Sequence, residues 1–197
     1  MLIESFGAGP WQTNCYVLAT GNNSECIIID PGLGSAPQIR EIIEDKNLKP
    51  IATMLTHGHI DHMWSIFPVA TGYGIPAFVH GDDRFLLNDP GAGVSLETKN
   101  ALMDMMSAGD VFAEPSDTRE LTDKMTLELA GLSFTVLHAP GHTQGSILFE
   151  FAGERKKIFT GDVLFAGAIG RTDLPGSSPD DMDASLRDVV LHLPDSA

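Results

Sequence analysis

The sequence predicts an α/β protein with a single domain, and three observations support this prediction. Short apolar runs rich in β-branched residues occur in two groups, over residues 2–80 and 125–160. Each group is accompanied by segments whose apolar residues recur with helical spacing. The chain has 197 residues, 43% of them hydrophobic, which is enough to bury the core of one α/β domain of ordinary size.

The first group is expected to contain two helices and five strands. Ser35 is a suitable N-cap for a helix that continues to about Asn47, with three isoleucines on one face. A second helix is expected after His62, as far as Val69. The strands are expected over residues 2–6, 15–19, 26–30, 51–55 and 75–80.

The second group predicts a series of short strands with hairpin turns at residues 130–131 and 153–155. An apolar stripe predicts a last helix over residues 184–193. Residues 88–118, between the two groups, show no clear pattern and are interpreted as an insertion. The strands of this group are expected over residues 125–129, 133–137, 146–151 and 157–160.

The strand at residues 51–55 leads into the segment His57-Gly58-His59-Ile60-Asp61-His62, which holds three imidazoles and a carboxylate. Neutral imidazole and carboxylate are the ligands that a borderline-soft divalent cation prefers. Because His57 and His59 are two apart on an extended loop, their side chains can project onto one ion. Clustered histidines also lose solvation and repel one another when protonated, unless a cation organises them. The segment therefore predicts a metal site rather than a solvated polar loop.

Two further ligand types follow predicted strands. His142 lies in Pro140-Gly141-His142-Thr143, after the strand at residues 133–137. Asp162 lies in Thr160-Gly161-Asp162, after the apolar pair at residues 158–159. Strand ends that converge on one edge of a sheet are a rigid place to mount a site, and glycine permits tight turns there. Together with residues 57–62, these residues predict a single centre.

These motifs resemble the metallo-β-lactamase superfamily, whose signature is a His-x-His-x-Asp-His loop followed by a single His and then an Asp. The segments Thr13-Asn14-Cys15-Tyr16, Ile29-Asp30-Pro31-Gly32 and Gly170-Arg171-Thr172-Asp173-Leu174-Pro175-Gly176 resemble its glyoxalase II-like (hydroxyacylglutathione hydrolase-like) branch. The resemblance spans nearly the whole chain. It implies an αββα sandwich of two mixed sheets flanked by helices, as one domain over residues 1–197.

The resemblance also implies two divalent metal ions. Zinc is the expected metal, with iron or manganese as alternatives, because imidazole and carboxylate accept all three with modest preference. A ligand role for His138 would duplicate that of His142, so His138 is interpreted as structural. By the resemblance, one ion would be held by His57, His59 and His142, the other by Asp61 and His62, and Asp162 would bridge them.

One position of the family is not matched. A further His, in a Pro-Gly-His turn after the last helix, completes the second metal site in the family, whereas this chain ends with Leu193-Pro194-Asp195-Ser196-Ala197. His192 is a poor substitute, because it is expected at the surface end of the helix over residues 184–193. The domain is therefore expected either to be truncated at its C-terminus or to have an incomplete and weak second site.

The activity that the resemblance implies is hydrolysis of a small thioester by a metal-bound hydroxide. Zinc lowers the pKa of bound water from 15.7 to about 7, so hydroxide exists at neutral pH. Asp61 would be the catalytic residue that orients the water and accepts its proton. Arg171 is the candidate substrate contact, although an internal ion pair with Asp173 is equally compatible with the sequence. Family members that bind glutathione carry an extra C-terminal helical domain, so a different thiol carrier is as compatible with this chain as glutathione.

Two alternatives belong to other classes. Persulfide dioxygenases resemble this chain along the same stretch and hold one iron with two His and one Asp. Their ligands would be His57, His142 and Asp162, which leaves positions open for a sulfur substrate and O₂. His59, Asp61 and His62 would then have no ligand role, which favours the hydrolase. The other alternative is a metal-binding protein without catalytic activity.

Composition excludes several partners. The net charge is −15, from 12 Lys plus Arg against 27 Asp plus Glu, and would repel a nucleic acid backbone. No apolar stretch is long enough for a membrane span, so a small molecule is the expected partner. Cys15 and Cys26 lie on adjacent expected strands out of register, so no disulfide is expected. These features favour the cytoplasm, and the sequence does not indicate an oligomeric state.

Overall fold

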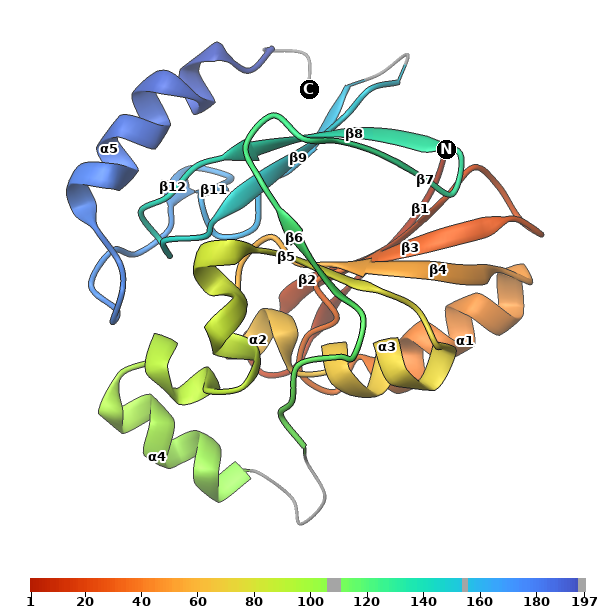
Figure 1. The fold of residues 1–197 in the computed structure, drawn as a ribbon, viewed down its shortest axis with the longest axis horizontal. Coiled ribbons are helices and arrows are strands. Elements are labelled where there is room, and N and C mark those ends of the chain that lie inside the picture. Colours follow the sequence, from red (N-terminus) through yellow and green to blue (C-terminus); the bar gives the residue numbers. More distant parts are fainter. Residues whose placement is uncertain (106–110, 154–155, 195–197) are drawn as a thin grey trace.

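The computed structural model describes residues 1–105, 111–153 and 156–194. Two β-sheets face each other, and helices cover the outer face of each, as Figure 1 shows. The helices α1 and α3 lie against one sheet, and α5 lies beyond the other. The αββα arrangement implied by the resemblance is confirmed.

The first sheet has six strands in the order β1-β2-β3-β4-β5-β6. The first three pair antiparallel, and β3 to β6 pair parallel, so this sheet is mixed as predicted. Parallel neighbours require crossover connections, and α1 and α3 occupy these connections on the outer face. The bounds are β1 Leu2–Ala8, β2 Thr13–Ala19, β3 Glu25–Ile29, β4 Lys49–Met54, β5 Ala77–His80 and β6 Thr118–Leu121.

The second sheet has the order β10-β9-β8-β7 and is antiparallel throughout. The prediction of two mixed sheets is therefore wrong for this one, because connections too short for a crossover join its strands. A separate two-stranded hairpin, β11 and β12, was not predicted, since each strand has only two residues. The bounds are β7 Thr126–Leu129, β8 Leu132–His138, β9 Ile147–Phe151, β10 Lys157–Phe159, β11 Leu164–Phe165 and β12 Ala168–Ile169.

The main core lies between the two sheets. Alternation along β3 sends Ile27 and Ile29 into this core, where they join Phe134 and Phe149 of the second sheet. Cys26 and Ile28 point to the other face of β3 and pack with α1. Full burial of such a side chain stabilises the folded state by about 1.5–3 kcal/mol. The two-residue period of β3 therefore fixes both the inter-sheet core and the helix layer.

The helices differ from the sequence prediction at two places. The helix expected over residues 62–69 is two helices, since the chain turns at residues 64–65 between α2 and α3. The last helix begins at Pro179, capped by the Ser178 hydroxyl, and ends at Asp188 rather than at residue 193. His192 lies in a 3₁₀ turn, η3. The bounds are α1 Ala36–Lys46, α2 Ile60–Met63, α3 Ile66–Tyr73, η1 Gly81–Leu87, η2 Pro90–Gly93, α4 Leu96–Met105, α5 Pro179–Asp188 and η3 Val190–His192.

Both cysteines are buried and unpaired, which confirms the expectation of no disulfide. Tyr16 is opposite Ile29 in the β2–β3 pair, and Cys26 is opposite Ala19, so the two sulfur atoms belong to distant positions of the ladder. Burial raises the pKa of the Cys26 thiol to about 12. Across the described residues, none of the helices combines the length and apolarity that a membrane crossing requires.

Candidate metal centre

The predicted ligands meet where strands of both sheets end. The segment 57–62 follows β4, His142 follows β8, and Asp162 follows β10. Gly141 has a φ of +139°, which side-chain-bearing residues rarely adopt, so it permits the turn that presents His142. The structure thus brings all six predicted ligand residues together from segments far apart in the chain.

Three histidines form what we call the tri-histidine half of the site: His57, His59 and His142. They can each offer a ring nitrogen within 4.8 Å of the others. His59 Nδ1 and His142 Nε2 are only 2.9 Å apart. All three residues are buried, with 2–3% of their surface exposed. A closely spaced and buried set of imidazole nitrogens matches the ligand set of a divalent cation.

The protonation of this half also fits a cation. Burial and then the neighbouring histidines lower the pKa of His57 well below its ordinary value, and the same effects lower the pKa of His59 to about 3. Both rings are therefore neutral at neutral pH. The Nε2 atom of His57 is buried without a hydrogen-bond partner among the described residues. A bound cation would satisfy a lone pair that would otherwise be costly to bury.

A backbone carbonyl group orients the ring of His142. Its Nδ1 lies 2.8 Å from the backbone carbonyl oxygen of Arg171, an acceptor to which this nitrogen must donate its proton. In this tautomer the lone pair is on Nε2, which faces His59 and Asp162. Fixing the tautomer of a ligating histidine through its other nitrogen is a regular feature of metal sites.

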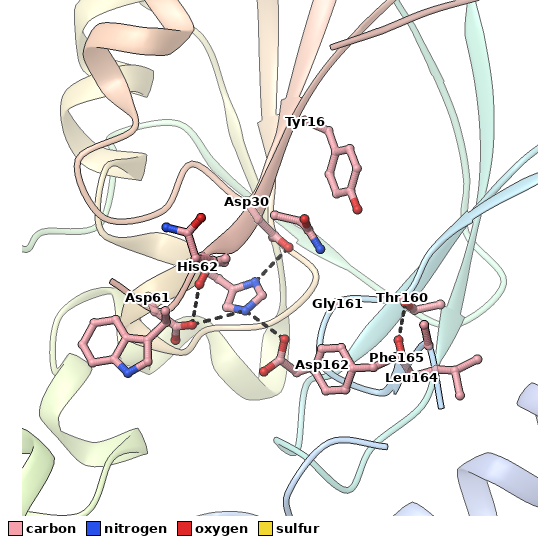
Figure 2. A pocket seen from close by; sticks show the side chains of 14 residues that line it. Tyr16, Asp30, Asp61, His62, Thr160, Gly161, Asp162, Leu164 and Phe165 are labelled. Carbon is pink, nitrogen blue, oxygen red and sulfur yellow. Dashed lines mark hydrogen bonds and ion pairs between the residues drawn. The ribbon is translucent and has the colours of Figure 1, made fainter. Parts of the chain in front are cut away.

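The second part, which we call the carboxylate half, consists of Asp61, His62 and Asp162. His62 Nε2 lies 3.1 Å from Asp162 Oδ1 and 3.5 Å from Asp61 Oδ2, as Figure 2 shows. The other oxygen of Asp162 lies 3.6 Å from His142 Nε2, so this carboxylate contacts both halves. His57, His62 and Asp162 form a second possible ligand group, which shares His57 with the first.

Three carboxylates surround His62 in the carboxylate half. Burial lowers the pKa of His62, but Asp30, Asp162 and Asp61 outweigh it and raise the pKa well above its ordinary value. Burial raises the pKa of Asp162, but the hydrogen bond from His62 and the surrounding imidazoles lower it overall. This half therefore presents a negative potential that favours a positive ion.

Two supporting residues were missed as functional residues by sequence reasoning. Asp30 accepts hydrogen bonds from the backbone N–H and the hydroxyl of Thr56, at 2.8 and 2.7 Å, and lies 2.9 Å from His62 Nδ1. Thr13 donates its hydroxyl to Asp61 Oδ2 at 2.7 Å. Both residues lie in segments that resemble the family, and this resemblance could have indicated a functional role. The sequence alone does not show which side chains they contact.

Two cavities open onto the centre. The larger, of about 420 Å³, borders the carboxylate half, and Tyr16 and Phe165 are among its lining residues (Figure 2). The smaller, of about 160 Å³, reaches His59 and His142 and is also lined by Arg171. Trp11, on the turn between β1 and β2, lines both cavities. A substrate can therefore approach the centre from either side of Trp11.

Arg171 forms an internal ion pair in the structure. Its Nε and Nη2 atoms contact the two carboxylate oxygens of Asp173 at 2.6 and 2.8 Å. The side chain of Arg171 is 61% exposed at the mouth of the smaller cavity. The alternative interpretation of Arg171 as an ion-pair partner thus describes its present contacts, and a substrate role requires exchange of Asp173 for a substrate anion.

The remaining histidines lie outside the centre. His192 is exposed and belongs to none of the possible ligand groups among the described residues. His138 stacks on His80 with ring centroids 4.2 Å apart and planes 13° apart, and its Nε2 lies 2.9 Å from the Gln144 carbonyl oxygen. Asp82 lies near this pair, but lone pairs in nearly parallel planes do not converge on one ion. We assign no metal site there.

The fold and this centre agree with a match to the model of the metallo-β-lactamase superfamily over residues 8–195. The chain belongs to this superfamily. It is 42% identical to an uncharacterized protein of Mycobacterium bovis, over 100% of this chain and 88% of that protein. It is 32% identical to the hydroxyacylglutathione hydrolase GloC of Haemophilus influenzae, over 99% of this chain and 87% of that enzyme.

Solved structures give the same fold. The crystal structure of BLEG-1 B3 metallo-β-lactamase has a TM-score of 0.83 and 34% identity, covering 98% of this chain and 87% of that one. A di-iron-bound form of TTHA1623 has a TM-score of 0.78 and 29% identity, covering 98% and 88%. The chain is therefore similar both to a metallo-β-lactamase and to a protein that holds two metal ions.

Proposed function

We propose that this chain is a two-metal hydrolase whose substrate is a small thioester. The observation that carries the proposal is the pair of adjacent ligand groups that share His57. One group consists of three buried imidazoles, and the other is bordered by carboxylates at the larger cavity. The hydroxyacylglutathione hydrolase relative supports a thioester as substrate.

The residues present fit two metal ions. His57, His59 and His142 would hold one ion, Asp61 and His62 the other, and Asp162 would bridge them. The support is the distance of Asp162 to both halves, 3.1 Å to His62 and 3.6 Å to His142. Zinc is the proposed metal, with iron or manganese as alternatives, since this ligand set accepts all three.

When bound, such metal ions supply a hydroxide at neutral pH and polarise the substrate carbonyl. Asp61 orients the attacking water and accepts its proton. Its Oδ2 atom already contacts Thr13 and His62, at 2.7 and 3.5 Å, so Oδ1 is the atom proposed to face the water. Thr13 holds the carboxylate in place, which keeps this oxygen aimed at the reaction.

The substrate is proposed to enter through the smaller cavity. Its walls include Trp11, Val94 and Leu174, which suit an apolar group, and Arg171 lies at its mouth. Arg171 would bind an anionic part of the thiol carrier in exchange for Asp173. Both buried cysteines are unpaired, which supports the cytoplasm as the proposed compartment.

The mononuclear-iron dioxygenase is the weaker alternative. Its ligands, His57, His142 and Asp162, would leave His59 and His62 without a ligand role. His59 Nδ1 nevertheless lies 2.9 Å from His142 Nε2, and His62 Nε2 lies 3.1 Å from Asp162. These contacts favour the larger ligand set and hence the hydrolase.

Thioester hydrolysis by the purified chain tests the proposal. The metal-loaded protein is incubated with hydroxyacylglutathione, acyl-coenzyme A and a small acyl thioester, and the released thiol is measured with a chromogenic reagent. We expect turnover of at least one thioester, loss of turnover after chelation and recovery after zinc is added. Turnover of a β-lactam without any thioester would contradict the proposed substrate class, and persulfide-dependent oxygen consumption would support the dioxygenase.

A further inference from the structure

A buried carboxylate that is not among the ligands lies behind the tri-histidine half. Asp83, in η1, is only 1% exposed. Its Oδ2 atom accepts hydrogen bonds from the backbone N–H of Gly58 and from the Thr143 hydroxyl, both at 2.7 Å. Its Oδ1 atom accepts one from the backbone N–H of Gly145 at 2.8 Å. Three donors satisfy a charge that would otherwise be costly to bury.

The donors belong to the two loops that carry the three histidines. Gly58 lies between His57 and His59, and Thr143 directly follows His142. The two loops come from different sheets, one after β4 and the other after β8. Asp83 therefore links the two loops through one side chain, in addition to the backbone hydrogen bond that the Ile147 N–H donates to the Thr56 carbonyl oxygen.

The glycines on both sides leave the space that this carboxylate occupies. A Cβ atom at Gly145 would lie 2.6 Å from Asp83 Cγ, and one at Gly58 would lie 3.1 Å from Asp83 Cβ. Both distances are tighter than ordinary carbon contacts, so larger residues at these positions would displace Asp83 or the loops. The close approach explains the glycine between His57 and His59 and the glycine two positions after Thr143.

The chemistry of the anchor requires an acceptor at both oxygens. In Asp83→Asn, one amide orientation would place NH₂ against Gly145 N–H, and the other would place it against Gly58 N–H and the Thr143 hydroxyl. Either orientation leaves at least one buried donor unpaired. A neutral side chain of the same size thus cannot hold both loops.

We infer that Asp83 is a positioning residue that fixes the separation of the two histidine loops and thereby sets the affinity of the tri-histidine half for its metal ion. The inference rests on the proposed metal centre. Groups that orient metal ligands change metal affinity or activity by about 10–100-fold when they are removed. The same loss is expected for Asp83→Asn, even though Asp83 contacts neither ion nor substrate.

Metal affinity of the folded protein tests this inference. The zinc affinities of the wild type and Asp83→Asn are measured by competition with a chromogenic chelator, at a temperature where circular dichroism shows that both metal-free proteins are folded. The absorption of the cobalt-substituted proteins reports the ligand geometry. We expect about 10–100-fold weaker zinc binding and an altered cobalt spectrum. Asp82→Asn, at the adjacent exposed position, is the matched control and should leave both unchanged.

A second variant covers the case in which Asp83→Asn does not fold. Thr143→Val keeps the size of the side chain and removes one donor to Asp83, and it should weaken zinc binding by about tenfold. Wild-type affinity and spectrum in a folded Asp83→Asn, or in Thr143→Val if the former is unfolded, would overturn the inference and leave the proposed function intact. A wild-type protein that binds no zinc would instead refute the proposed function.

Discussion

The two halves of the centre differ in burial, charge and access. In the tri-histidine half the proposed ligands are imidazole rings, exposed by only 2–3%. In the carboxylate half the side chains of Asp61 and Asp162 are 24% and 28% exposed. The smaller cavity, of about 160 Å³, reaches the first half, whereas the second borders the larger cavity, of about 420 Å³. We therefore propose that the tri-histidine half retains its cation more tightly, and that the carboxylate half exchanges ligands and water.

This difference predicts an order of loading. The buried rings of the tri-histidine half are held in place by the surrounding protein, so binding of a metal ion there requires little reorganisation of the side chains. In the carboxylate half a metal ion must compete with water and with protons bound to the side chains. We therefore expect the first metal equivalent to occupy the tri-histidine half, and activity to depend on the second.

The largest effect is expected when one proposed ligand of the tri-histidine half is removed. Structural zinc binding of about 10–16 kcal/mol is shared among about four ligands, so one ligand contributes roughly 3 kcal/mol. The substitution His142→Ala should therefore weaken binding of the first zinc ion by more than about 100-fold. Chelator competition measures the affinity. His192→Ala, which removes an exposed histidine outside the centre, is the control and should bind zinc as the wild type does.

The next effect separates catalysis from binding. Asp61→Asn keeps the size of the side chain but cannot accept the proton, so kcat for thioester hydrolysis should fall by about 10²–10⁴-fold. The first zinc ion should bind with unchanged affinity, because Asp61 belongs to the carboxylate half. Steady-state kinetics at saturating metal measures kcat. An unchanged kcat would show that another group takes the proton.

Loss of the support behind His62 is expected to act more on the carboxylate half than on the tri-histidine half, which Asp30 reaches only through the Thr56 hydroxyl beside His57 Nδ1. Asp30→Asn replaces the carboxylate that accepts hydrogen bonds from Thr56 and faces His62 Nδ1. It should lower the affinity for the second metal ion by about 10–100-fold. Calorimetric titration of the two binding steps measures this. The exposed Asp45→Asn provides the comparison, and equal weakening of both steps would argue that Asp30 supports the whole fold rather than one half.

The smallest effect concerns the entrance to the smaller cavity. Arg171→Ala should raise KM for an anionic thioester by about tenfold, the effect of losing one charge-assisted contact. Unfolding temperature should change little, because exposed ion pairs contribute about 0–1 kcal/mol. Arg119→Ala is a matched control, since Arg119 forms the same kind of pair with Asp117 two residues away. Equal KM values in both variants would remove the substrate role of Arg171.

The clustering of the six proposed ligand residues could be predicted from the sequence, because each lies just past a strand that its own apolar pattern marks. His142 and Asp162 follow β8 and β10, and the segment 57–62 follows β4, so a local pattern was enough to indicate their common edge. The free cysteines were predicted for the same reason, since the register of a hairpin follows from its turn.

The supporting residues could not be predicted in this way. Asp83 lies in η1, and its partners are 25 to 62 positions away along the chain, so no local pattern marks it as an acceptor. The β11–β12 hairpin is too short to show periodicity. The apolar stripe over residues 184–193 predicts a last helix that begins too late, because Ser178 and Pro179, which fix its start, precede the stripe.

The number of metal ions per chain tests the central claim most directly. The protein is purified without oxygen or chelator, and its metal content is measured by mass spectrometry against protein concentration. We expect close to two divalent ions per chain, with zinc as the main metal, and the second ion lost first on dialysis. A single iron ion per chain, retained by His57, His142 and Asp162 when His59 is replaced by alanine, would contradict the two-metal centre and support sulfur oxidation.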